Sequence, residues 1–130
     1  MEEDVKSFRD LIVWHRSIEL CVAVYDFTRA FPKEEMFGLR SQLQRAAVSI
    51  PSNIAEGSGR RSSGEFVQFL GTAKGSNNEV QTQLTIAGKL GFGNTEARGT
   101  CEKLSSEVER MLNALITSVN LRKNRPSVRK

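Results

Sequence analysis

Q-L-Q-R-A-A-V-S-I-P-S-N-I-A-E-G-S-G-R-R, residues 42–61, is the segment on which the architecture of this chain depends. Its apolar residues recur at the three- and four-residue spacing of one helix face, yet Pro51 stands in the middle and two arginines close it. Proline removes one backbone hydrogen bond and crowds the carbonyl four residues earlier, at Ala47. Inside a helix this costs about 3 kcal/mol. The segment therefore predicts a helix with a local defect.

Two outcomes are open at Pro51: the helix stops near Ser49, or it bends and continues. We expect the bend, because Ile50 and Ile54 keep the helical spacing across the proline. Polar side chains that can bond the freed backbone groups are Ser49, Ser52 and Asn53. Gly57 and Gly59 are expected to end this helix.

Glu56 belongs to the same segment and has two interpretations. On the inner side of the helix with Asn53, it would be buried and paired with an arginine of a neighbouring helix or subunit. On the outer side of the helix, its carboxylate would only add a charge that favours solubility.

Working outward, the remaining sequence has the apolar period of amphipathic helices. The four predicted helices cover about 8–30, 35–57, 63–90 and 95–121. Their short connections favour antiparallel neighbours, so we expect an all-α, up-and-down four-helix bundle with the second helix kinked at Pro51. Residues 1–7 form an acidic N-terminal segment, and 122–130 a basic disordered tail.

The first helix carries two apolar stripes, which is more than one core contact needs. One comprises Leu11, Trp14, Ile18, Cys21 and Tyr25. The other comprises Leu20, Val24, Phe27 and Phe31, and we assign it to an interface between subunits. An apolar stripe left bare on a monomer would be an unusual surface, so the width of this helix predicts a homo-oligomer.

The third helix has the clearest seam, which alternates steps of four and three. Its members are Phe66, Leu70, Ala73, Asn77, Val80, Leu84 and Ala87. Asn77 is the one polar member, and it either fixes the register of the bundle or lies at the edge of the seam.

The formal net charge of +4 comes from the C-terminus, because the last nine residues carry five positive charges and no acid, leaving −1 for the rest. Within the body, residues 29–61 hold six basic and three acidic residues. At the start of the third helix, Arg60 and Arg61 offer guanidinium groups to a phosphate, and Ser62 and Ser63 add hydroxyls. Arg40, Arg45 and Lys74 complete the predicted nucleic-acid surface. The alternative is that these cations are merely solvated.

Catalytic and metal chemistry find little support. His15 is the only histidine, and the run G-S-G-R-R-S-S-G lacks the lysine of a phosphate-binding loop. Cys21 and Cys101 are expected to be reduced core residues. We therefore expect no enzyme, no metal and no cofactor. The sequence has no apolar run long enough for a membrane span, and its N-terminus is acidic. Both features favour the cytoplasm.

Several motifs resemble those of a known family, the four-helix-bundle proteins encoded in intervening sequences of bacterial large-subunit ribosomal RNA genes. The longest is S-I-P-S-N-I-A-E-G at 49–57, followed by Gly59 and Arg60. The others are D-L-x-V-W at 10–14, F-P-x-E at 31–34, G-L-R-S-Q-L at 38–43, Phe66 to Leu70, Gly75-Ser76, Glu79 and Gln83-Leu84. The resemblance covers about residues 8–121.

This resemblance implies an up-and-down bundle that assembles as a ring-like homopentamer. The chain is also similar to the accessory variability determinant of diversity-generating retroelements, a basic pentamer that binds nucleic acid and a reverse transcriptase. The near-neutral body of this chain departs from that strongly basic protein.

Two functions remain open from the sequence. The first is a non-enzymatic oligomeric scaffold that binds RNA or DNA through phosphate contacts, with weak base preference and steep salt dependence. The second is an adaptor whose ring docks another protein, such as a reverse transcriptase, without any nucleic-acid role of its own.

Overall fold

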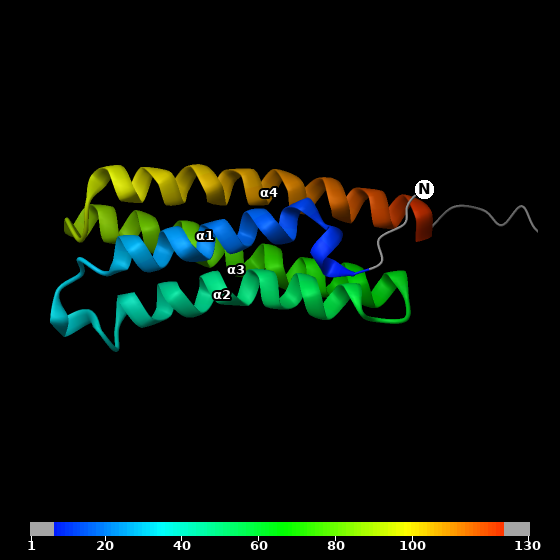
Figure 1. Ribbon diagram of the computed structural model, residues 1–130, viewed down its shortest axis with the longest axis horizontal. Coiled ribbons are helices and arrows are strands. Elements are labelled where there is room, and N and C mark those ends of the chain that lie inside the picture. The colour runs from blue at the N-terminus through cyan, green and yellow to red at the C-terminus, as the bar shows by residue number, and fades with distance from the viewer. Residues whose placement is uncertain (1–6, 124–130) are drawn as a thin grey trace, which may run out of the picture.

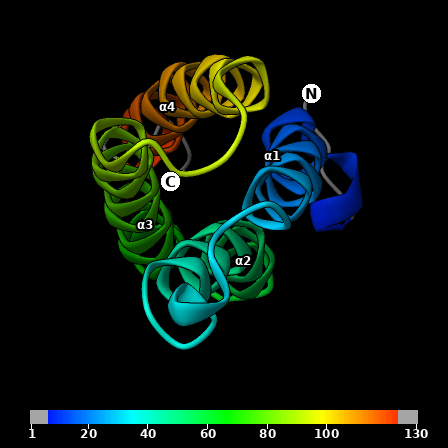
Figure 2. The same cartoon turned by 90° about the vertical axis from the view of Figure 1, so that its left-hand side faces the viewer.

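The computed structural model describes residues 7–123, and within that range it contains α-helices, short 3-10 helices and no strand. The four α-helices are α1 (Ile12–Thr28), α2 (Leu39–Ser58), α3 (Ser63–Leu90) and α4 (Thr95–Lys123). Successive helices run in opposite directions along one long axis (Figure 1), and seen from the end they surround a common centre (Figure 2). The prediction of an all-α protein with four helices is confirmed. Residues 1–6 and 124–130, including most of the predicted basic tail, lie outside the described range.

The first two helices begin later than their apolar periods predicted. Ser7 and Asp10 do form a capping box, but it caps the short 3-10 helix η1 (Phe8–Asp10), and the chain is extended at Leu11 before α1 starts. A second 3-10 helix, η2 (Lys33–Glu35), precedes α2. The carboxylate of Glu35 then accepts a hydrogen bond of 2.9 Å from the backbone N–H of Leu39, so an acid placed before the helix serves as its cap.

Helix α2 continues through Pro51, as expected, and the alternative in which it stops near Ser49 is wrong, while the bend itself stays a prediction. Proline leaves the Ala47 carbonyl without its usual helical donor. The thiol of Cys21 on α1 supplies one, donating to that carbonyl at 3.0 Å. Around it, Ser52 donates to the Val48 carbonyl and Asn53 to the Ser49 carbonyl. Side chains and a neighbouring helix thus bond the backbone around the proline.

Gly57 is buried inside α2 and does not end it. A Cβ at this position would lie 2.6 Å from Phe69 Cβ and 3.0 Å from Phe66 Cδ1, both on α3. Glycine is therefore needed for close packing of α2 against α3. Helix α2 ends one residue later, at Ser58, and Gly59 caps it.

Polar side chains also cross between helices inside the bundle. Asn77 on α3 is fully buried, donates to the Ser105 carbonyl of α4 at 3.0 Å and accepts from the Ser105 hydroxyl at 2.8 Å. The edge position considered for Asn77 is wrong, and its reciprocal bonding suits a residue that fixes register. Ser49 of α2 and Ser76 of α3 make a similar pair at 2.8 Å.

The turn between α3 and α4 closes one end of the bundle. Gly91 caps α3 in the left-handed conformation, with φ at 76°, and Gly93 has the same φ. Gly93 lies against the ring of Phe27, where a Cβ would come within 2.5 Å of it. Phe27, Phe31 and Phe92 form a cluster with ring centroids 5.1 and 5.5 Å apart, which ties the end of α1 to this turn.

Candidate functional site

An apolar groove with a volume of about 370 Å³ lies on the surface between α1 and α2. We call it the α1–α2 groove, and it is lined by Phe8, Trp14, Ile18, Cys21, Val48, Pro51, Ser52 and Ala55. Ser52 is its one polar lining residue. The sequence motif around Pro51 thus forms one wall of the groove, and Trp14 and Ile18 belong to the other.

Apolar side chains continue from the groove along the outer side of α1. Val22 is 58% exposed, Tyr25 44% and Val48 43%. Trp14 and Tyr25 are eleven residues apart, so the surface extends for about 16 Å along the helix. We call the groove together with Val22 and Tyr25 the α1–α2 face. It has the length of about three turns of a partner helix.

The stripe assigned to a subunit interface proves to be the core. Leu20, Val24, Phe27 and Phe31 are 0 to 6% exposed within the single chain, so they have no surface to offer a partner. The stripe expected to be core instead contributes Ile18 and Tyr25 to the surface. Spacing marked both stripes correctly, but the rotation of α1 buries the second stripe completely, whereas the first is divided between core and surface.

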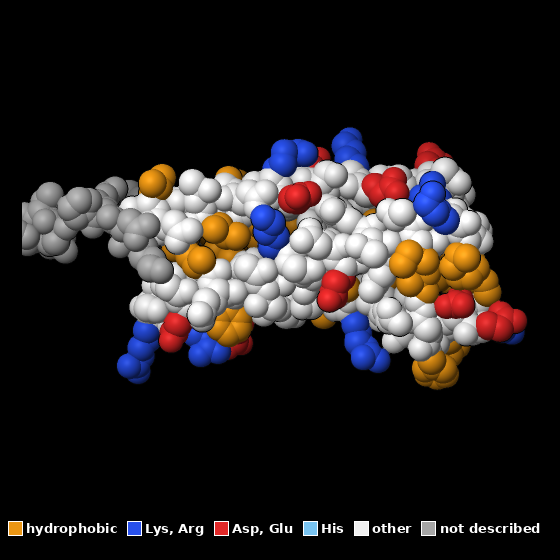
Figure 3. Space-filling view, turned by 180° about the vertical axis from the view of Figure 1, so that it is seen from behind, with side chains coloured by type: hydrophobic (Ala, Val, Ile, Leu, Met, Phe, Trp, Pro, Cys, Tyr) orange, Lys and Arg blue, Asp and Glu red, His pale blue; other side chains and the backbone are white. Residues whose placement is uncertain are grey.

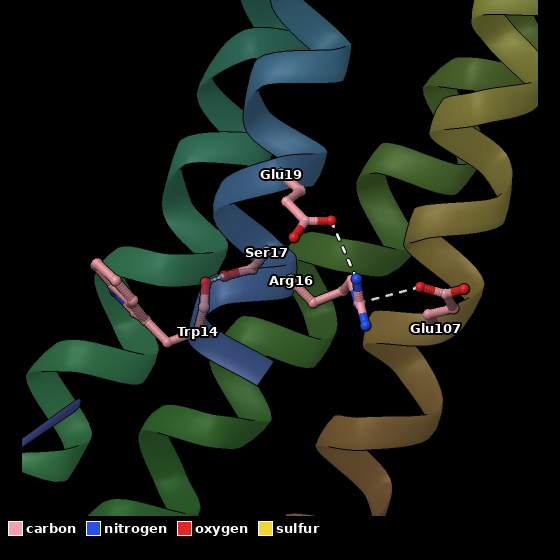
Figure 4. A network of polar contacts seen from close by, with 5 residues as sticks. All are labelled: Trp14, Arg16, Ser17, Glu19 and Glu107. Atoms are coloured by element: carbon pink, nitrogen blue, oxygen red, sulfur yellow. Dashed lines mark hydrogen bonds and ion pairs between the residues drawn. The ribbon is translucent and has the colours of Figure 1, made fainter. Parts of the chain in front are cut away.

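The rotation of α1 can be followed at Arg16, which lies between Trp14 and Ile18. Its guanidinium contacts Glu19 at 3.1 Å and reaches across to Glu107 of α4 at 3.2 Å (Figure 4). Trp14 leaves the helix on the other side, toward α2 (Figure 4). One side of α1 is thus held to α4 by half-buried charges, and the other carries the groove.

A second apolar hollow, of about 380 Å³, lies between α1 and α4. It is lined by Asp10, Leu11, Ile12, Val13, Met111, Ala114 and Leu115. Ile12 is 68% exposed at its rim. The apolar surface of α1 therefore extends around its N-terminal half. Of the residues on the α1 side of this hollow, only Leu11 belongs to an apolar stripe predicted from the sequence.

The predicted phosphate-binding residues do not converge on one site. Arg40 lies in the first turn of α2 and Arg60 just beyond its last, so a 20-residue helix, about 30 Å long, separates them. Lys74 is half-buried on α3, eleven residues after Ser63 and so about 17 Å from it. On the face shown in Figure 3, basic and acidic side chains alternate. Only the four residues 60–63 are neighbours.

Within that cluster, two of the four side chains are already engaged. Arg60 forms an ion pair with Glu56 and lies over the ring of Phe69, 4.7 Å from its centroid. The Ser62 hydroxyl caps α3 by accepting from the Glu65 N–H at 3.1 Å. Arg61 and Ser63 are exposed. Glu56 is exposed on α2, so of its two interpretations the structure has the outer position, not the buried one beside Asn53.

Both cysteines are free, and their thiols are shielded. Burial raises the pKa of Cys21 to about 12. For Cys101 burial also raises the pKa to about 12, helped by the nearby charges of Glu102 and Asp26. Since only the thiolate is a good nucleophile or metal ligand, neither side chain is prepared for such chemistry at neutral pH. His15 is exposed and donates to the Arg9 carbonyl at 2.7 Å.

Among residues 7–123, no group of three His, Cys, Asp or Glu side chains is placed to hold a metal ion. A search of the same part of the chain finds no helix with the length and apolar character of a membrane span.

Fold and surface together define the class: a four-helix-bundle protein with an apolar groove between two of its helices. The chain belongs to the 23S rRNA-intervening sequence protein family, whose model matches residues 9–114. The resemblance seen in the sequence motifs is thereby confirmed.

A solved structure of the same architecture comes from Bacteroides thetaiotaomicron and is described as a protein of unknown function from the S23 ribosomal protein family. It superposes with a TM-score of 0.73, covering 82% of this chain and 96% of that one, at 24% identity. A likeness at that identity shows the fold alone. A search of curated proteins found no match.

Proposed function

We propose that this chain is a non-enzymatic scaffold whose subunits associate through the α1–α2 face. The observation that carries the proposal is the row of exposed apolar side chains on α1, next to a groove lined almost entirely by apolar residues. A continuous apolar surface of this kind is unusual on a monomer and marks an interaction site. The face takes over the role that the sequence had assigned to Leu20, Val24, Phe27 and Phe31.

The assembly that we propose is a closed ring of identical subunits, five in number as the family resemblance implies. Soluble homo-oligomers have closed symmetry, because an interface that does not close produces filaments. A bend of α2 at Pro51 would shape the groove that faces the neighbouring subunit. The free thiols suit a reducing compartment, so we place the scaffold in the cytoplasm.

Sedimentation velocity of the full chain at micromolar concentration tests this function. We expect the wild type to sediment as an oligomer and the Val22→Glu variant as a monomer, because a charge would be desolvated in the interface. Leu121→Glu is the matched control, since Leu121 on α4 is also exposed, at 69%, and α4 contributes no residue to the α1–α2 groove. A monomeric wild type, or equal effects of the two substitutions, would refute the proposal.

Binding of RNA or DNA through its phosphates is a second candidate function. One observation favours it: Arg61 and Ser63 are exposed at the N-terminus of the 28-residue helix α3. One subunit offers only these two side chains to a nucleic acid, but a ring would present the same pair in every subunit. Binding would be weak in base preference and steeply salt dependent.

A gel-shift series at low salt tests the second candidate. Arg61→Glu should weaken binding at least tenfold, whereas Lys89→Glu, which makes the same charge change at the far end of α3, should have a smaller effect. Arg60 is left intact, because its contacts with Glu56 and Phe69 are structural. Equal effects of the two variants would indicate net charge alone. A pull-down with and without nuclease would then separate nucleic acid from a docked protein.

A further inference from the structure

Phe37 is the most exposed large apolar side chain of the described residues, at 91%. It lies in the connection between α1 and α2, directly after Met36, which is itself 48% exposed. A bare phenyl ring with an apolar neighbour is costly to leave in water, since burying such a side chain contributes about 2 kcal/mol or more. Insertion of the Phe37 ring into an apolar cavity would therefore be favourable.

The α1–α2 groove offers such a cavity, but not to the Phe37 of the same chain. Val48 and Pro51, which line the groove, are 11 and 14 residues further along. Because α2 is a continuous helix from Leu39, they lie about 16–21 Å away from Phe37. A phenylalanine side chain cannot span that distance, so only a second molecule can bring its ring to the groove.

Charges beside the ring and beside the groove are complementary. Glu34, three residues before Phe37, is exposed and makes no ion pair among residues 7–122. Arg45, three residues before Val48, is exposed, and its one hydrogen bond is a long contact of 3.5 Å with Ser41. Arg45 also lines hollows beside the groove, together with Tyr25 and Val48. An acid thus accompanies the ring, and a base accompanies the cavity.

We infer that Phe37 of one copy inserts into the α1–α2 groove of a second copy, with Glu34 facing Arg45 across the contact. The inference rests on the proposed self-association and names the residues that produce it. The ring and the groove are different surfaces of one molecule, so each copy can give its Phe37 to one neighbour and accept that of another. Such head-to-tail contacts generate a ring when the rotation closes.

Sedimentation equilibrium on the full chain tests the ring insertion. Phe37→Ala should weaken association at least tenfold, because an aromatic anchor in a desolvated pocket contributes a large share of binding. Leu121→Ala is the control: Leu121 is 69% exposed and lies near the end of α4, a helix that contributes no residue to the groove or to the connection that holds Phe37. Association unchanged by Phe37→Ala would overturn the inference.

A charge exchange gives an independent readout. Glu34→Arg and Arg45→Glu should each weaken association several-fold, and the two together should restore it, because the pair is then reversed. A double variant no tighter than the weaker single variant would overturn the pairing. Circular dichroism should show the same helix content in every variant, since all the substituted side chains are exposed.

The results separate the inference from the function on which it rests. A monomeric wild type overturns both. Oligomers that dissociate with Val22→Glu but persist with Phe37→Ala and with both charge variants overturn the inference and leave the scaffold in place. Dissociation by Val22→Glu and Phe37→Ala, with rescue by the charge exchange, supports both.

Discussion

At the scale of single residues, glycines on neighbouring helices differ in whether the structure has room for a side chain at their positions. Gly57 is required because α3 comes so close to α2 that a Cβ would overlap Phe69. Gly71 and Gly75 on α3 face open space, with nothing within 4 Å of an added Cβ. Sequence alone cannot distinguish these three glycines, because the distinction depends on the distance to another helix.

Gly57→Ala should lower the free energy of unfolding by about 1–2 kcal/mol, since overpacking costs more than the gain in helix propensity. Gly71→Ala, and likewise Gly75→Ala, should raise it by about 0.5–1 kcal/mol. Urea denaturation followed by circular dichroism measures both changes. A Gly57→Ala variant as stable as Gly71→Ala would mean that the close approach of α2 and α3 is not rigid.

Pro51 and Cys21 form the other informative pair at this scale. The notable feature is the cysteine, which the sequence suggested only as a core residue. Its thiol donates to the carbonyl that the proline leaves without a partner, 26 residues away in sequence. No spacing rule could connect the two, because the connection exists only when α1 lies against α2.

A double-mutant cycle should show this coupling. Cys21→Ala should cost about 1 kcal/mol more in the wild-type background than in the Pro51→Ala background, where the new backbone N–H bonds the Ala47 carbonyl. The cavity left by the cysteine is common to both backgrounds and cancels. Urea midpoints of the four proteins provide the measurement, and strictly additive effects would argue against the thiol bond.

At the scale of elements, the ends of helices depend on chemistry that the apolar period does not contain. Helices α3 and α4 begin where the sequence predicted, after the side-chain caps Ser62 and Asn94, and α3 ends as predicted, before Gly91. The starts of α1 and α2 were missed by several residues. Short 3-10 turns replace the first turn in both cases, because the chain must change direction at Leu11 and before Leu39.

The pairing of α3 with α4 supplies a prediction at this scale. Asn77→Ala should destabilise the protein by about 1–3 kcal/mol, because it leaves the Ser105 hydroxyl and carbonyl buried without their partner. Adding Ser105→Ala should cost little further, since the hydroxyl that lost its partner is removed with it. Thermal unfolding of the two variants decides this, and fully additive losses would contradict the reciprocal bond.

At the scale of the whole molecule, the architecture was predictable and the interaction surface was not. Four apolar periods with short connections are enough to specify an antiparallel bundle. The face that remains outside depends on the rotation of each helix about its axis. For α1 that rotation is fixed by contacts such as Arg16 with Glu107, which join residues 91 positions apart. This is why the sequence assigned the buried stripe of α1 to an interface between subunits.

Self-association through the α1–α2 face makes stability depend on protein concentration. A tenfold increase should raise the free energy of unfolding by about 1 kcal/mol per subunit in the wild type, by mass action. The Val22→Glu variant should show no such increase. Urea unfolding at two concentrations measures it, and identical midpoints for the wild type would speak against an obligate assembly.

The arrangement of the four helices also gives the subunit a polarity. The described chain begins and ends at one end of the bundle, and the connection that holds Phe37 lies at the opposite end (Figure 1). In a closed ring, each subunit is related to the next by a rotation about one axis, so every chain end would emerge on the same side of the ring, whereas an antiparallel pair would place the chain ends on opposite sides. Energy transfer between fluorophores attached to the C-termini of neighbouring subunits would therefore be efficient in the ring and weak in the pair.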